Sequence, residues 1–317
     1  MMVILEIKER LKKFYGKFDI YILAIVKFLG AFIALSLINA NIGYMERLKE
    51  SVLVLLISLL CSILPIGGMV FICAGFVLAH FYTISLELAA ITLVLFLLMF
   101  CLYIRFDTSD CYIILLTPIL FWLKIPYLVP LLVGMTGGIT SVVPVGMGVI
   151  GYYLLNYAKE NATILTNSTT EDILKKFTLI IDGLIQNKLM MLTVIVFALV
   201  TIVVYLIKKL SVDYSFMIAI GVGAILNISL LLLGDFSLDI TAAVGEIIIG
   251  SLVSAAIMLA LQFFIFSVDY TRTEHVQFED DDYIYYVKAV PKMSVTTQEI
   301  NVKKINAQKA KKTTQRR

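Results

Sequence analysis

Apolar residues fall in long runs along the chain, separated by short polar breaks. Uninterrupted apolar runs cover about residues 20–40, 84–105, 189–207, 213–233 and 242–266. Because a helix of about 20 residues crosses the hydrocarbon core of a bilayer, each of these runs predicts one membrane-spanning helix.

Residues 51–83 form a further apolar stretch that is interrupted by helix breakers. Fourteen residues, 51–64, precede Pro65, Gly67 and Gly68, and residues 69–83 follow them. A helix of 14 residues measures about 21 Å, which is shorter than the hydrocarbon core of about 30 Å. We therefore expect either two short spans or one re-entrant pair of helices here.

The stretch 111–157 is the most strongly interrupted, with four of the six prolines and six of the eighteen glycines of the chain. Its breaks predict three short segments, 111–123, 127–142 and 145–157, the last two divided at Pro144. Unpaired backbone groups are tolerated in a membrane only against protein or a water-filled cavity. Paired interruptions of this kind mark the binding site of some transporters. We therefore expect residues 51–83 and 111–157 to line a site.

The candidate pathway or binding residues combine uncharged polar groups, helix breakers and two acids. Glu87 and Glu246 each lie a few residues inside a predicted span, where an ionisable group indicates a function unless it is shallow enough to be hydrated. In the central stretch the candidates are Thr117, Thr136, Gly137, Gly138, Thr140, Ser141 and Pro144. Opened backbone carbonyl and amide groups would supply much of the binding there.

Two amphipathic segments flank the predicted spans. Residues 1–19 alternate apolar and basic residues, which fits either a helix on the membrane surface or a solvated helix leading into the first span. Near residues 170–187, five apolar residues recur at helical spacing and predict an amphipathic helix on the outer side; they are Ile173, Phe177, Ile180, Ile181 and Leu184.

Composition agrees with a membrane protein, because 60% of the residues are hydrophobic and 15% are charged. Soluble domains average roughly 45–50% apolar and about 25% charged residues. We therefore predict an all-α polytopic membrane protein with about ten helical segments in residues 20–266, in contact with the lipid bilayer. Lys and Arg mark the cytoplasmic side, so both termini are predicted to be cytoplasmic.

The composition changes after residue 266. Residues 276–290 carry an acidic cluster followed by aromatic and β-branched residues, which predicts a small hairpin within a cytoplasmic extension, 267–302. Residues 303–317 are basic and poor in apolar residues, and they predict a disordered tail. A cytoplasmic protein partner could bind through 267–317, whereas no nucleic-acid-binding motif accompanies the charge.

The sequence contains no recognised catalytic motif. The four cysteines show no metal-binding spacing and there are only two histidines, so we expect no cofactor, no metal site and no enzymatic activity. The favoured function is a transporter or permease-type subunit with a site lined by 51–83 and 111–157. The alternative is a structural membrane subunit that recruits a cytoplasmic partner through its C-terminal residues.

One segment after the last span carries a resemblance. The run Tyr270-Thr-Arg-Thr-Glu-His-Val-Gln-Phe-Glu-Asp-Asp281, with Tyr285-Tyr-Val-Lys-Ala-Val-Pro-Lys292, is similar to that of an uncharacterised membrane-protein family of anaerobic Gram-positive bacteria. The resemblance extends through the spans. It implies a cell-membrane location and brings no known activity or site residues.

Overall fold

The structure is a computed structural model that describes residues 2–106, 109–167, 173–210, 212, 214–238, 244–266, 274–279 and 284–289. The chain divides into two compact units, one of Met1–Gly16 with Ser267–Arg317 and one of Lys17–Phe266. The predicted tail 303–317 lies outside the described residues.

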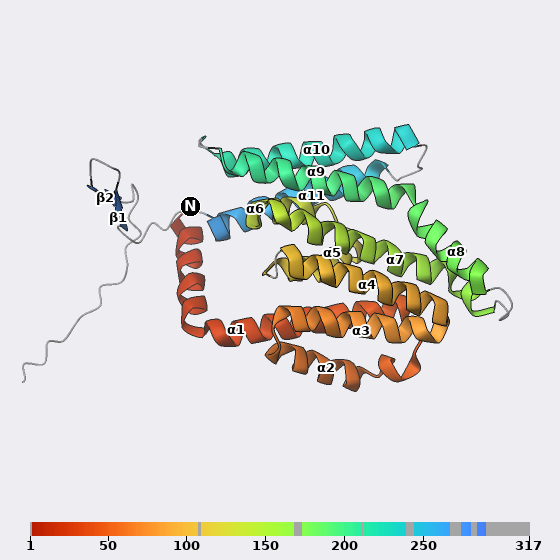
Figure 1. The fold of residues 1–317 in the computed structure, drawn as a ribbon. Coiled ribbons are helices and arrows are strands. Elements are labelled where there is room, and N and C mark those ends of the chain that lie inside the picture. Colours follow the sequence, from red (N-terminus) through yellow and green to blue (C-terminus); the bar gives the residue numbers. More distant parts are fainter. Residues whose placement is uncertain are drawn as a thin grey trace, which may run out of the picture. The chain divides into compact units, whose positions relative to one another are not determined.

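The unit Lys17–Phe266 is built from helices, as the apolar runs predict (Figure 1). Helix α1 begins in the other unit and is interrupted by a non-helical backbone conformation at Phe18. The elements in chain order are α1 (Met2–Ile42), η1 (Glu46–Lys49), α2 (Ser51–Ile63), α3 (Ile66–Ile84), α4 (Leu86–Phe106), η2 (Ser109–Cys111), α5 (Tyr112–Trp122), α6 (Leu128–Thr136), η3 (Ile139–Ser141), α7 (Val142–Asn167), α8 (Ile173–Ile185), α9 (Lys188–Lys208), α10 (Ser215–Leu238) and α11 (Val244–Phe266).

Six helical segments are long and apolar enough to cross a membrane, within the part of the chain that the structure describes. They are Phe14–Ile42, Ile66–Ile84, Ile139–Thr166, Lys188–Lys208, Ser215–Leu238 and Val244–Phe264. The apolar helices Ser51–Ile63, Leu86–Leu102 and Tyr112–Trp122 are shorter. The chain is therefore a multi-pass membrane protein, whereas the total of ten membrane segments stays a prediction.

The predicted interruption between 51–64 and 69–83 is confirmed, because α2 ends at Ile63 and α3 begins at Ile66 with Pro65 as its N-cap. Its bounds differ from the prediction, because Gly67 and Gly68 belong to the first turn of α3. Pro144 lies in the first turn of α7, and the predicted division of two helices at this residue is wrong. Proline is accepted there because the first backbone N–H groups of a helix have no intrahelical acceptor. The break falls earlier, at Gly137 and Gly138.

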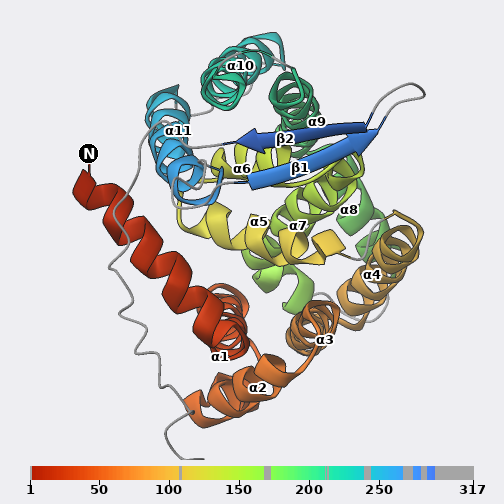
Figure 2. The same cartoon turned by 90° about the vertical axis from the view of Figure 1, so that its left-hand side faces the viewer.

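Two hydrophobic clusters form the core of the helical unit. The first joins α5, α6, α7, α9, α10 and α11 through residues such as Leu131, Phe197 and Ile220. The second joins α1 to α4 with α7 and α8 through residues such as Leu35 and Phe81. Helix α7 contributes to both clusters and lies between the two groups of helices (Figure 2).

The predicted outer amphipathic helix corresponds to α8. Ile180 is fully buried and Leu184 is mostly buried, which agrees with the predicted apolar face, whereas Ile181 is 42% exposed. Helix α8 follows α7 at one end of the bundle (Figure 1). In the same view, α6 and the end of α11 lie toward the opposite end of the bundle.

In the other unit, β1 (Glu274–Glu279) and β2 (Ile284–Ala289) pair as antiparallel strands. Glu274 lies opposite Ala289, and Glu279 lies opposite Ile284. The side chain of Tyr286 in β2 is 77% exposed. The cytoplasmic location of this strand pair stays a prediction.

Candidate functional site at the α5–α6 hairpin

Helices α5 and α6 form a short hairpin within the helical unit. They contain 11 and 9 residues, or about 16 Å and 14 Å of helix. Ser141, which follows α6, donates a hydrogen bond from Oγ to Oδ2 of Asp110, which precedes α5. The hairpin therefore begins and ends at the same level of the bundle, and we call these two ends together the open end of the hairpin. Its turn lies deeper, between the surrounding helices.

The turn of the hairpin is a Schellman motif, in which two backbone hydrogen bonds close the end of a helix. The N–H of Ile125 donates to the carbonyl of Leu120 at 3.0 Å, and the N–H of Lys124 donates to that of Phe121 at 3.0 Å. Lys124 takes the left-handed position of this motif, with φ 61°. Glycine is the usual residue there because it has no Cβ.

The turn lies against the middle of the surrounding helices. The Nδ2 group of Asn227, near the middle of α10, donates to the carbonyl oxygen of Tyr127 at 3.4 Å. The ring centroid of Tyr127 is 6.4 Å from that of Phe197, near the middle of α9. A Cβ atom at Gly250 of α11 would lie only 2.6 Å from the Tyr127 ring, so glycine permits this contact.

Lys124 forms an ion pair across the turn. Its Nζ lies 3.6 Å from Oε1 of Glu246 in the first turn of α11, and the two side chains are 79% and 69% exposed. Exposed ion pairs contribute little stability. The pair matters because it places two charges next to a turn whose backbone contacts the middle of the bundle.

Buried polar atoms lie on α10 and α11, the two helices that contact the turn through Asn227 and Gly250. Asn227, Ser251 and Ser254 are fully buried. Within the described residues, the Oδ1 of Asn227 and the hydroxyls of Ser251 and Ser254 have no hydrogen-bond partner. Ser251 directly follows Gly250, which contacts the Tyr127 ring. These groups give the region unused hydrogen-bonding capacity.

The open end of the hairpin collects several of the predicted site residues. The backbone N–H of Gly138 donates to Ser141 Oγ at 2.9 Å, and a Cβ atom at Gly137 would collide with the same hydroxyl. Thr136 donates from Oγ1 to the carbonyl of Leu132 at 2.8 Å, and Thr140 is exposed. Together with the buried Pro144 of α7, these residues form the connection between α6 and α7.

Thr117 lies apart from this group. Its side chain is fully buried and donates to the carbonyl of Ile113 at 2.8 Å, within α5. A Cβ atom at Gly148 of α7 would lie 2.6 Å from the Thr117 Cβ. Thr117 is thus in the tight contact between α5 and α7, with its hydroxyl already engaged.

The two acids predicted as site residues make separate contacts. Glu87 accepts a hydrogen bond from Ser85 at 2.5 Å and lies 3.8 Å from Lys176 of α8, with side-chain exposures of 14% for Glu87 and 13% for Lys176. Glu87 therefore connects α4 to α8, whereas Glu246 is the acid at the hairpin turn.

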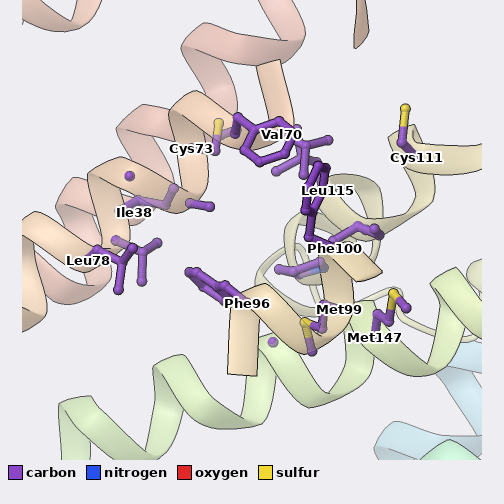
Figure 3. A pocket seen from close by; sticks show the side chains of 18 of the residues that line it. Ile38, Val70, Cys73, Leu78, Phe96, Met99, Phe100, Cys111, Leu115 and Met147 are labelled. Atoms are coloured by element: carbon purple, nitrogen blue, oxygen red, sulfur yellow. The ribbon is translucent and has the colours of Figure 1, made fainter. Parts of the chain in front are cut away.

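An apolar cavity of about 350 Å³ lies beside α5. Its walls come from α1, α3, α4, α5 and α7, and the side chains of Val70, Phe96, Phe100 and Leu115 lie around it (Figure 3). Leu115, Ile119 and Trp122 line it from α5, whereas Ile113 and Leu120 of the same helix belong to the first hydrophobic cluster. Helix α5 therefore separates the cavity from the core of α9, α10 and α11.

Sequence reasoning missed the groups on α10 and α11 as site residues. Asn227 is the one amide side chain in the apolar run 213–233, and this isolation was the available signal. Its contact with Tyr127 joins residues 100 positions apart, which periodicity does not reveal. Lys124 was visible as a charge inside the central stretch, but its left-handed backbone was not.

Comparisons with protein-family models, curated proteins and solved structures give no match for this chain. The functional argument therefore rests on the geometry of the described residues.

Proposed function

We propose that this multi-pass membrane protein is a transporter in which the α5–α6 hairpin is the moving gate. The observation that carries the proposal is Lys124 in the left-handed position at the hairpin turn. A non-glycine residue in this conformation costs roughly 1–2 kcal/mol. Glycine would form the same turn without this strain, so the presence of lysine supports a functional role for its charge rather than a role in shaping the turn.

Two polar contacts of the turn are weak, which supports its movement. The hydrogen bond from Asn227 to the Tyr127 carbonyl is long, at 3.4 Å, and the ion pair with Glu246 is exposed. Exposed ion pairs contribute about 0–1 kcal/mol. Displacement of the turn would then uncover Asn227, Ser251 and Ser254.

The orientation of the hairpin follows from the basic residues near its open end. A Cβ atom at Gly134 of α6 would contact Val204, which places the end of α6 close to Lys208 and Lys209 at the end of α9. Because Lys and Arg mark the cytoplasmic side, we infer that the open end and both termini are cytoplasmic. The turn would then face the outer half of the membrane.

Cysteine labelling tests the gate. Cys61, Cys73, Cys101 and Cys111 are first replaced by alanine, and single cysteines are introduced as Lys124→Cys or Thr140→Cys. A membrane-impermeant maleimide is added to either side of sealed vesicles. We expect Lys124→Cys to be labelled from both sides, because the turn alternates between them, and Thr140→Cys only from the cytoplasmic side. Labelling of Lys124→Cys from one side alone would show a fixed hairpin and contradict the proposal.

A second candidate function is a structural subunit that recruits a cytoplasmic protein. The observation that favours it is the exposure of neighbouring residues of β2, with Tyr285, Tyr286 and Val287 at 37%, 77% and 44%. A two-stranded hairpin is marginally stable by itself, so a partner surface would stabilise it.

Co-purification in mild detergent tests this second function. Deleting 267–317 should release the partner, and Tyr286→Ser should weaken its retention without affecting the helical unit. If the full-length protein purifies without a stoichiometric partner, the recruitment function is wrong.

A further inference from the structure

We propose that the cavity beside α5 binds one acyl chain of a membrane lipid. This inference does not depend on transport, because a lipid chain can occupy the cavity whether or not the hairpin moves.

The chemistry of the cavity wall favours a hydrocarbon occupant. No charged residue and no hydroxyl side chain is among the described residues that line it. Its largest wall residues are aromatic or sulfur-containing, with Phe71, Phe96, Phe100, Trp122, Met99 and Met147. A polar solute would lose its hydration there without gaining hydrogen bonds, and a buried water needs 2–4 polar partners.

The size and the surroundings of the cavity favour a lipid chain as this occupant. A volume of about 350 Å³ is in the range of small-molecule pockets. Phe71 of α3 with Leu93 and Leu97 of α4 line the cavity and are also exposed, at 52%, 47% and 54%. Helices α3 and α4 therefore connect the cavity to the apolar outer surface of the bundle. In a membrane that surface is covered by acyl chains.

Two glycines in the wall allow the cavity to be filled by mutation. A Cβ atom at Gly75 of α3 or at Gly151 of α7 would meet no atom within 4 Å. Each position therefore has room for a Cβ atom, and Gly151→Leu and Gly75→Leu add apolar volume to the cavity wall from α7 and α3. Gly221 of α10 is equally unobstructed but does not line the cavity, so Gly221→Leu is the matched control.

Trp122 provides the readout, because it lines the cavity and is the single tryptophan of the chain. Bromine atoms quench tryptophan fluorescence on close contact. The full-length protein is delipidated in detergent and titrated with phosphatidylcholine that carries brominated acyl chains, at a low mole fraction in the micelles. Acrylamide, a water-soluble quencher, and a short-chain brominated acid are the comparison probes.

We expect saturable quenching of Trp122 by the brominated phosphatidylcholine in the wild-type protein and in Gly221→Leu. Gly151→Leu and Gly75→Leu should weaken the apparent affinity at least about tenfold. Gel filtration identifies any variant that fails to fold, and the other filling variant then decides the comparison. Mass spectrometry of the protein before delipidation should detect a retained lipid in the wild type, and less of it in the filled variants.

Three results would overturn the proposal. The first is equal quenching in the filled variants and in Gly221→Leu. The second is stronger quenching by acrylamide than by the brominated lipid, which would indicate a hydrated cavity. The third is saturable quenching by the short-chain acid alone, which would indicate a small solute. Each of these results leaves the labelling test of the gate unaffected, so the two proposals can fail separately.

Discussion

Lys124 combines a strained backbone with a charged side chain, and substitution can separate the two contributions. Glycine reaches φ 61° without the steric conflict of a Cβ atom, whereas alanine does not. Lys124→Gly and Lys124→Ala both remove the ion pair with Glu246. We predict that Lys124→Gly is more stable than Lys124→Ala by roughly 1–2 kcal/mol.

Thermal unfolding in detergent compares the two variants directly. Glu246→Gln is the control for the lost charge interaction, and it should change the unfolding temperature only slightly because the pair is exposed. If Lys124→Gly and Lys124→Ala unfold together, the turn does not impose the left-handed conformation.

Two glycines in α7 differ in the space that surrounds them. A Cβ atom at Gly148 would lie 2.6 Å from the Thr117 Cβ, whereas one at Gly151 would meet nothing within 4 Å. We predict that Gly148→Ala loses about 1–3 kcal/mol through overpacking of α5 against α7. Gly151→Ala should be neutral or slightly stabilising, since alanine favours helix over glycine by about 1 kcal/mol. Unfolding in denaturant measures both, and equal stabilities would contradict the close contact.

His80 is fully buried in α3 and both of its ring nitrogens are engaged. Nδ1 accepts a hydrogen bond from the backbone N–H of Met45 at 3.1 Å, so Nε2 carries the proton and donates to Oδ1 of Asn39 at 2.9 Å. We predict that His80→Leu costs about 1–3 kcal/mol, because it removes both hydrogen bonds and leaves the partly buried Met45 N–H and Asn39 Oδ1 without these partners. Tyr82→Leu, at a 67% exposed position of the same helix, is the control and should be near neutral. A similar unfolding temperature for the two variants would argue against this network.

At the scale of elements, α8 is held to its neighbours by polar contacts. Tyr157 of α7 donates from its hydroxyl to the carbonyl of Leu179 at 3.0 Å, and Glu87 of α4 pairs with Lys176. Because the pair is mostly buried, removing one partner leaves an uncompensated charge. We predict that Glu87→Gln or Lys176→Met alone destabilises by about 1–3 kcal/mol, a range reduced for the residual exposure.

A double-mutant cycle measures this coupling. The variant with both substitutions should be more stable than the sum of the single effects implies, since neither charge remains unpaired. Additive losses would mean that the two side chains act independently and that this ion pair does not hold α8 to α4.

The sequence predicts helices well where an apolar run is compatible with only one kind of element. The runs 84–105, 189–207 and 242–266 correspond to α4, α9 and α11 within a few residues, because helices in lipid must satisfy their backbone internally. A proline in the sequence is compatible with two structures, because it can end one helix or lie in the first turn of the next. That ambiguity explains why Pro144 was misread as a break while it lies at the start of α7.

The candidate site was only partly predictable. Gly137, Gly138 and Ser141 are close in sequence, and local turn chemistry brings them together at the open end of the hairpin. The turn itself depends on Asn227 and Gly250, which come from distant helices. Their approach to Tyr127 follows from tertiary packing, for which a single sequence contains no direct signal.

For the whole molecule, the division into two compact units predicts independent stability of the helical unit. Residues 267–317 belong to the other unit, so deleting them should leave the unfolding temperature of the helices within about 2–4 °C of the full-length value. Fluorescence-detected unfolding of Trp122, within the helical unit, measures this difference. A large decrease would show that the C-terminal residues stabilise the helices.

The contacts of the hairpin turn also set an order of events during synthesis. The Tyr127 carbonyl accepts from Asn227, 100 residues later in the chain, and the Tyr127 ring packs on Gly250, so the full set of contacts forms only after another 123 residues, from 127 to 250, have been made. At translation speeds of about 5–20 residues per second, this delay is roughly 6–25 s. During this delay the two helices, which are too short to cross the bilayer, gain the partners of their turn one helix at a time, from α9, α10 and finally α11. The packing around the hairpin turn is therefore complete only when α11 has been made.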